Sequence, residues 1–290
     1  MHYSNPLKLT DLDFDCRESV ALAHQTHIIV TVVLPLRFNR RGGDAHKNPY
    51  ADRGKKILAQ RYAIQLPQLL TERLQGHGHN RLVEIILSTF SEWLARNEMI
   101  FFRDYTDHGT RHVEEVIETA CGLISATALE FFSSEDAAAL VCSAVLHDSA
   151  LHLQEPSFVA LVKDDPSWRL APEFDDIPWA IAWKYYVTEA SRLSQNQLKE
   201  LFGIDTPITP PALDDTSSWT PVQYLYIGEF LRRNHARIAQ QIAHSGIPGA
   251  KGSSPLESIS ADDPLLPFIH LSGLIARSHG MNLSVCPKSP

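Results

Sequence analysis

The sequence has few cysteines, no long apolar run and no N-terminal leader pattern. Four cysteines are scattered singly, without a Cys-x-x-Cys spacing: Cys16, Cys121, Cys142 and Cys286. This usage is typical of thiols that serve as small core residues in a reducing compartment. No apolar run approaches the ~20 residues that cross a bilayer, and no basic stretch precedes an apolar segment at the N-terminus. We therefore expect a cytoplasmic protein that does not use a membrane.

Basic charge is also in short supply. The chain has 26 Lys and Arg against 34 Asp and Glu, which gives a formal net charge of −8. A surplus of negative charge opposes general affinity for phosphate backbones, so no duplex nucleic acid is expected as a partner, although a local basic pocket is not excluded. The 290 residues exceed the usual size of a single domain, and one core with an extra lobe or two units are both compatible with that length.

Residues 1–60 form an N-terminal extension that carries little chemical signal. The segment HIIVTVVLPLRF at 27–38 is rich in β-branched residues and is followed by a polar, glycine-containing stretch, which predicts a short strand and then a loop. The Gly-Gly pair at 42–43 follows two arginines but lacks the Lys and Ser/Thr of a P-loop, so a surface loop is the better interpretation.

A helical period dominates the rest of the chain and predicts an all-α domain over 61–290. Apolar residues at spacings of 3 and 4 predict helices over 79–99 and 112–132. A third helix follows, with Ser133 or Ser134 placed to cap its start and His147 at its end.

The second half of the domain alternates loops and helices. Two Pro-rich, acidic stretches, 154–178 and 203–218, are predicted as long connections, the first with a short helix. Between Thr220 and Gly246 a helix of more than twenty residues is expected, and a last helix over 264–280 ends at a glycine.

Two polar side chains end the most apolar helix. The run from Ala137 to Leu146 is followed by His147 and Asp148, which should not sit at the end of a buried helix without a partner. Adjacent helical positions lie about 100° apart, so these two side chains do not stack on one another, but both can reach an ion held between their helix and its neighbours. His112 opens the preceding helix on its inward face and is a candidate ligand.

Further histidines occupy inward positions later in the chain. His235 lies on the apolar stripe of its helix, and His279 lies at the end of the last helix. His108 is in a loop-like segment, and we rank it behind His112 as a ligand. Four helix-borne histidines and one carboxylate form a mixed nitrogen and oxygen set, which suits one or two ions of Mn, Fe, Co, Ni or Zn better than Mg alone. A lone buried histidine is more often a hydrogen-bonded core residue than a metal ligand. The prediction of a metal site therefore depends on several such histidines occurring together with Asp148.

The order of these residues resembles the HD superfamily of metal-dependent phosphohydrolases. The similarity is carried by the segments YTDHGTRHVEEV, AVLHDSALHL, YIGEFLRRNHARIA and IARSHG, and covers about 101–280. One branch is particularly similar, the bacterial HD proteins encoded with or fused to an Hsp90-like ATPase region. The resemblance implies a compact helical HD-domain core after the irregular N-terminal extension, and an Hsp90-like ATPase region or protein as a partner.

The resemblance also implies roles for individual residues. His112, His147 and Asp148 would hold a metal ion, Asp148 would bridge to a second one, and His235 and His279 would match the extra histidines of binuclear members. His147 and Asp148 would carry the catalysis, in which a metal-activated water attacks a nucleotide or another small phosphoester. Four residues are expected to bind the substrate: Arg232, Arg233, His108 and Arg111.

One departure from the family pattern leaves alternatives open. The family motif closes with a further Asp beyond the position of His279, whereas this sequence ends eleven residues later without one. We expect that the helical domain over 61–290 continues in a longer protein that supplies this ligand. A non-catalytic module of HD fold, which binds a nucleotide or transmits a signal, is the main alternative, and a purely structural role for the histidines ranks last.

Overall fold

The computed structural model describes residues 63–103, 105–163, 177–260 and 263–280. The described part is built from α-helices and short 3-10 turns and contains no strand, which confirms the all-α fold. Its α-helices are α3 (Gln68–Leu74), α4 (His79–Arg96), α5 (Thr110–Leu123), α6 (Ala126–Phe131), α7 (Ser134–Leu146), α8 (Glu155–Val162), α9 (Trp179–Ala190), α10 (Gln195–Phe202), α11 (Pro221–Ser245) and α12 (Leu266–Ser278). The N-terminal extension, with the predicted strand over 27–38, lies outside the described residues.

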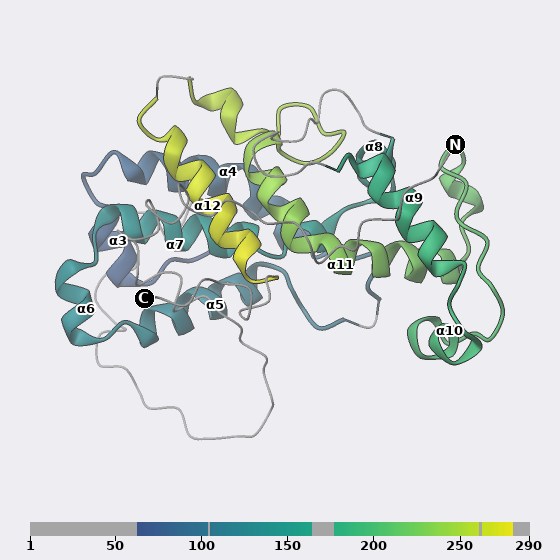
Figure 1. Cartoon of the computed structure of the whole chain (residues 1–290). Helices are drawn as coiled ribbons and strands as arrows, with labels where there is room; N and C mark the ends of the chain where they lie inside the picture. Colours follow the sequence, from purple (N-terminus) through teal and green to yellow (C-terminus); the bar gives the residue numbers. More distant parts are fainter. Residues whose placement is uncertain (1–62, 104, 164–176, 261–262, 281–290) are drawn as a thin grey trace, which may run out of the picture.

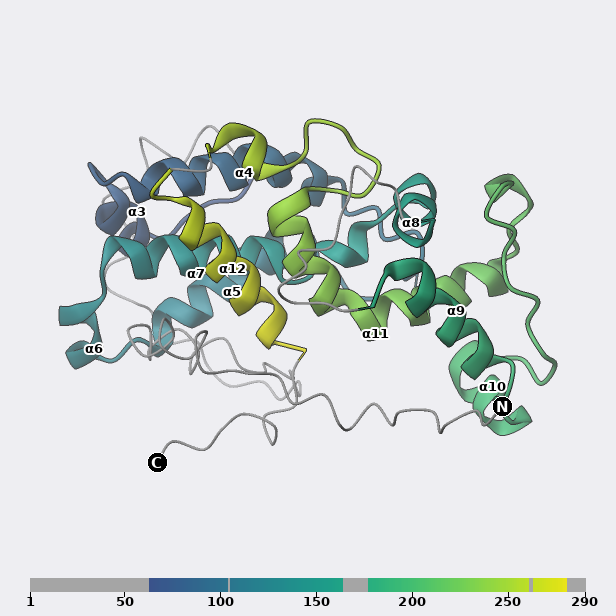
Figure 2. The same ribbon diagram turned by 45° about the horizontal axis from the view of Figure 1, so that its top comes forward.

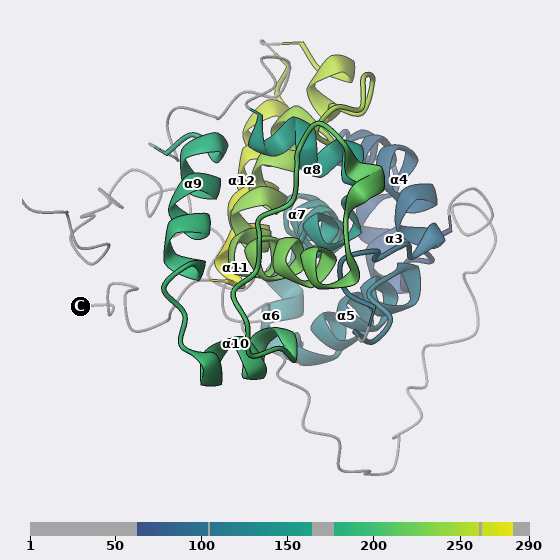
Figure 3. The ribbon, with the colours of Figure 1, turned by 90° about the vertical axis from the view of Figure 1, so that its right-hand side faces the viewer.

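Helix α7 lies in the middle of the described helices (Figure 3). It packs against α3, α4, α5, α11 and α12, and every residue from Ala137 to Leu146 is buried. A helix that is apolar on all sides is expected to be buried in this way. Its start is fixed by Ser133, whose hydroxyl accepts the Asp136 N–H while the Asp136 side chain accepts the Ser133 N–H. The residues that follow α7, beginning with His147 and Asp148, are therefore attached to a rigid, buried helix.

Helices α11 and α12 run side by side over α7 (Figures 1 and 2). Small residues on both helices allow their backbones to approach closely. A Cβ at Gly273 would lie 3.0 Å from Cβ of Ala243, and a Cβ at Gly280 would lie 2.5 Å from Cβ of Ala236. The close contact near Gly280 brings the C-terminal end of α12 against the middle of α11.

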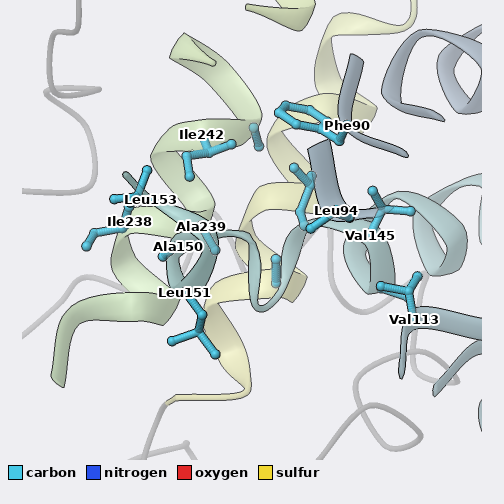
Figure 4. Packing of buried hydrophobic residues seen from close by; sticks show 14 of the residues in the cluster. Phe90, Leu94, Val113, Val145, Ala150, Leu151, Leu153, Ile238, Ala239 and Ile242 are labelled. Atoms are coloured by element: carbon cyan, nitrogen blue, oxygen red, sulfur yellow. The ribbon is translucent and has the colours of Figure 1, made fainter. Parts of the chain in front are cut away.

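The turn after α7 is fixed by apolar neighbours on both sides. The 3-10 turn η1 (Ser149–His152) packs against α4 and α11. Figure 4 shows Ala150 and Leu151 of this turn, with Leu153, beside Ile238 and Ala239 of α11. All of these side chains are at most 4% exposed. Asp148, which stands between α7 and η1, is thus held from both directions along the chain.

Helices α8, α9 and α10 lie at the opposite end of the molecule from α6 (Figure 1). The short helix expected within 154–178 is α8, while α9 and α10 were not predicted. The single helix predicted over 112–132 is wrong, because the chain breaks after Leu123 and restarts as α6. Ser125 causes the restart, since its side chain accepts the Ala128 N–H as an N-cap. No helix among the described residues is long and apolar enough to span a membrane.

Gly228 is expected to be required for stability, because α11 touches the backbone of Phe101 at this point. A Cβ at Gly228 would lie 2.4 Å from the carbonyl oxygen of Phe101. We expect Gly228→Ala to lower the free energy of unfolding by about 3 kcal/mol, measured by urea denaturation. The matched control is Gly122→Ala in α5, an exposed site with no atom near the added methyl group, which should raise stability by up to about 1 kcal/mol. Equal effects at both glycines would contradict this account of the contact.

Candidate metal centre

Asp148 stands at the junction of α7 and η1. His147 is the C-cap of α7, and Asp148 leaves the helical conformation with φ −106° and ψ 10°. This bend aims the carboxylate into the space between α5, α11 and the end of α12. The Asp148 side chain is only 15% exposed, so its charge requires nearby partners.

Oxygen Oδ2 of Asp148 faces three histidines. Its distances to Nε2 are 3.0 Å for His147, 3.4 Å for His112 and 4.0 Å for His108. The Nε2 atoms of His112 and His147 are 3.3 Å apart, and the rings of His108 and His112 lie 4.9 Å apart between centroids. His112, which lies in the first turn of α5, thus meets the end of α7.

Oxygen Oδ1 of Asp148 faces the histidines of the later helices. Its distances to Nε2 are 3.6 Å for His279 and 3.9 Å for His235. The two Nε2 atoms are 2.7 Å apart, a proximity made possible by the close contact of α11 and α12. Together with His108, His112 and His147, these residues and Asp148 form the histidine cluster.

Two sets of potential metal ligands share Asp148. His108, His112 and Asp148 form one group, and Asp148, His235 and His279 form the other, with the ligand atoms of each group within 4.8 Å of one another. Asp148 is the only carboxylate in either group among the residues that the structure describes. Asp263, which precedes α12, is instead paired with Arg81 of α4 at 2.9 Å.

Backbone carbonyls orient four of the imidazole rings. Nδ1 contacts a carbonyl oxygen three residues earlier in His147 (Ala144, 2.7 Å), in His235 (Arg232, 2.6 Å) and in His279 (Ala276), and two residues earlier in His108 (Thr106, 2.6 Å). A carbonyl only accepts, so each Nδ1 carries the hydrogen and each Nε2 presents its lone pair to the cluster. Metal-binding histidines are held by outer hydrogen bonds of this type.

The cluster requires positive charge. Lone pairs that face a carboxylate and one another repel unless a proton or a metal ion lies between them. Burial alone would raise the pKa of Asp148, but the nearby imidazoles of His147, His112 and His279 hold it well below its usual range. Burial would lower the pKa of His147, yet Asp148 raises it. A set of convergent imidazole nitrogens around one carboxylate could hold a metal ion.

The predicted phosphate-binding arginines differ in their surroundings. Glu229 in α11 is 9% exposed and accepts bonds from Nε and Nη2 of Arg232 at 2.7 and 2.8 Å. It also accepts a bond from Nε of Arg233 at 2.7 Å, while Nη1 of Arg233 is bound to Glu189 at 2.6 Å. Burial would raise the pKa of Glu229, but the two arginines hold it below its usual value.

Arg232 is the better placed of the two for a substrate. Its side chain is 49% exposed and is one helical turn before His235, whereas the Arg233 guanidinium is held between two carboxylates and over the Tyr186 ring. Arg111 is 79% exposed on α5 and pairs with Glu115 at 3.0 Å. The structure therefore brings His108 into the cluster, places Arg232 beside it, and leaves Arg111 paired on the outer face of α5.

Three residues of this region were not assigned a role from the sequence. Glu229 holds Arg232, and its spacing of three residues within the segment EFLRR could have indicated this. Tyr105 is 43% exposed and its ring lies 6.0 Å from that of His108. His152 donates to the backbone carbonyl of His108 at 3.0 Å, a contact across 44 positions for which the sequence holds no signal.

A comparison of the sequence with models of known protein families gives a match that covers most of the chain. The family model described as HD-CE matches residues 102–289, which includes every member of the histidine cluster. No curated protein and no solved structure gives a significant match to the chain.

Proposed function

The chain belongs to the HD-CE family, and from this membership we propose that it is a metal-dependent phosphohydrolase that acts on a nucleotide or another small phosphoester. The observation that carries the proposal is the position of Asp148 between two sets of histidines, with one carboxylate oxygen toward each. Two ions that share a carboxylate are a common arrangement in enzymes that hydrolyse phosphoesters.

The residues of the histidine cluster would form two metal-binding sites that share Asp148. His108, His112, His147 and Oδ2 of Asp148 would hold one ion, and His235, His279 and Oδ1 would hold the other. When bound, such ions lower the pKa of water toward neutrality and neutralise charge on phosphate oxygens. The Nδ1 bonds to backbone carbonyls keep the rings in place, so binding an ion requires little rearrangement.

Arg232 would bind the phosphate of the substrate. Guanidinium groups recognise phosphate oxygens through charged hydrogen bonds. Glu229 holds Nε and Nη2 of Arg232, which fixes the side chain on the same helical face as His235. Tyr105 lies near both His108 and Arg232, so we place the substrate between this ring and the metal centre. A role of Arg233 and Arg111 in substrate binding stays a prediction from the sequence.

A non-catalytic role is the second candidate, and one observation favours it. Asp148 is the only carboxylate in either ligand group among the described residues, and a centre with one acidic ligand binds divalent ions less firmly than one with two. In that case the chain would bind a nucleotide or transmit a signal, and coupling to an Hsp90-like ATPase region belongs to this proposal.

Release of inorganic phosphate from a panel of nucleotides and simple phosphoesters tests the proposal. We expect turnover by the wild-type chain loaded with Mn²⁺, Co²⁺ or Zn²⁺, and none after treatment with a chelator. The control is the double variant His147→Ala with Asp148→Ala, in which metal content and turnover should both be lost. Turnover that survives this double change would rule out the proposed centre, and metal binding without turnover would favour the non-catalytic role.

A further inference from the structure

His152 is a buried histidine outside the two ligand groups. It is the last residue of η1, four positions after Asp148, and is 1% exposed. Its ring meets the indole of Trp93 from α4 in an edge arrangement, with 5.9 Å between the centroids. Only one of its two ring nitrogens has a hydrogen-bond partner among the described residues. A neutral imidazole has one N–H and one bare nitrogen.

The hydrogen bond of His152 identifies which nitrogen carries the hydrogen. Nε2 lies 3.0 Å from the carbonyl oxygen of His108, and Nδ1 is buried without a hydrogen-bond partner among the described residues. Because a carbonyl only accepts, Nε2 is the donor and Nδ1 is the bare nitrogen. Burying the unprotonated Nδ1 without a partner costs desolvation free energy, and the hydrogen bond from Nε2 to the His108 carbonyl offsets part of that cost.

This bond joins two parts of the metal centre. His108 and Asp148 belong to the same ligand group, but in the chain they are separated by the three helices α5, α6 and α7. Through His152, the turn that follows Asp148 is tied directly to the backbone of His108. The other side of the His108 loop is tied to the end of α4, since Oδ1 of Asp107 accepts from the Gly109 N–H at 2.8 Å and from Nδ2 of Asn97 at 2.9 Å.

The direction of the His108 ring depends on this backbone. Nδ1 of His108 donates to the Thr106 carbonyl at 2.6 Å, which turns Nε2 toward Oδ2 of Asp148, 4.0 Å away. The ring is therefore oriented by its own loop rather than by a helix. A bond that fixes the His108 carbonyl fixes the position from which Nε2 is presented.

We propose that His152 is a positioning residue for metal binding: by holding the His108 carbonyl, it keeps the His108 imidazole directed at Asp148 and completes the His108–His112–Asp148 group. The inference rests on the proposed function only in requiring that this group binds a divalent ion. Outer hydrogen bonds that hold metal ligands typically contribute about 10–100-fold in metal affinity.

Titration of the full chain with Co²⁺ tests the proposal, because the visible absorption of bound Co²⁺ reports its ligands independently of turnover. We expect His152→Leu to weaken binding at one of two sites by about 10–100-fold and to alter the absorption of that site. We expect His152→Gln, whose side-chain N–H can donate to the same carbonyl, to restore both. The matched control is His244→Leu. His244 is also a buried histidine, 5% exposed, and lies beside His270 where α11 meets α12. This change should leave the affinity for Co²⁺ unchanged.

Combination with His108→Ala shows whether His152 acts through His108. In the His108→Ala background, His152→Leu is expected to cause no further loss of Co²⁺ affinity. Wild-type protein that binds no Co²⁺ would overturn the proposed function. Wild-type protein that binds Co²⁺ while His152→Leu binds it equally well, or additive losses in the double variant, would overturn the role of His152 alone.

A measurement on the wild-type chain covers the case in which His152→Leu does not fold. Nitrogen NMR of the histidine side chains distinguishes the two neutral tautomers. We expect His152 to carry its hydrogen on Nε2 at neutral pH, in the presence and absence of Co²⁺. A hydrogen on Nδ1 would overturn the proposal, because Nε2 would then be unable to donate to His108.

Discussion

Asp148→Asn is expected to remove both metal ions, whereas His279→Gln is expected to remove one. Asp148 presents Oδ2 to one group of histidines and Oδ1 to the other, so both ions depend on the same charge. The amide of asparagine keeps the shape of the side chain but supplies no negative charge. We expect the affinity of each site for Mn²⁺ to fall by at least about 100-fold in Asp148→Asn.

Calorimetric titration of the metal-free protein with Mn²⁺ measures this difference. His279→Gln should keep the site formed by His108, His112 and His147, because these three histidines face Oδ2 of Asp148, whereas His279 faces Oδ1. Thermal melting of the metal-free variants is the control for folding. Loss of a single site in Asp148→Asn would contradict a shared carboxylate.

Arg232→Gln is expected to reduce kcat/KM for a phosphoester by about 100-fold. This change removes a fixed positive charge that would neutralise phosphate oxygens, and removal of one such group typically costs about 10²–10³ in rate. Metal content should be unchanged, because the ligands lie on other side chains. The measurement is steady-state phosphate release at saturating metal.

Arg233→Gln provides the comparison, since the neighbouring arginine shares Glu229 but differs in its other contacts. Arg233 is bound between Glu229 and Glu189, so its loss should lower the free energy of unfolding more than that of Arg232. Its effect on kcat/KM should be smaller. A larger loss of kcat/KM in Arg233→Gln than in Arg232→Gln would assign the phosphate to Arg233 instead.

The sequence predicted those parts of the fold and centre that depend on local pattern. The apolar run before His147 marks a buried helix, and a serine cap at 133 or 134 and the limits of α11 follow from residues next to them in the chain. His112, His147 and Asp148 were predicted as ligands because they end or open such helices. The later histidines, His235 and His279, were predicted as ligands because they lie on inward positions of predicted helices.

Other parts depend on contacts between distant residues. Helix α9 is stabilised by aromatic side chains that meet Phe230 of α11, such as Trp183, with 5.1 Å between the ring centroids. The sequence pattern within 179–190 does not indicate that these aromatic side chains pack against Phe230. The difference between Arg232 and Arg233 depends on Glu189, 44 positions before Arg233, and the position of His108 depends on His152 in the same way.

The location of bound metal tests the central claim most directly. A crystal of the protein grown with Mn²⁺ or Zn²⁺, measured at the absorption edge of that metal, should give an anomalous scattering peak on each side of the Asp148 carboxylate. One peak should lie beside His112 and His147, and the other beside His235 and His279. The absence of any peak within the histidine cluster, with metal present in the crystal, would contradict the account.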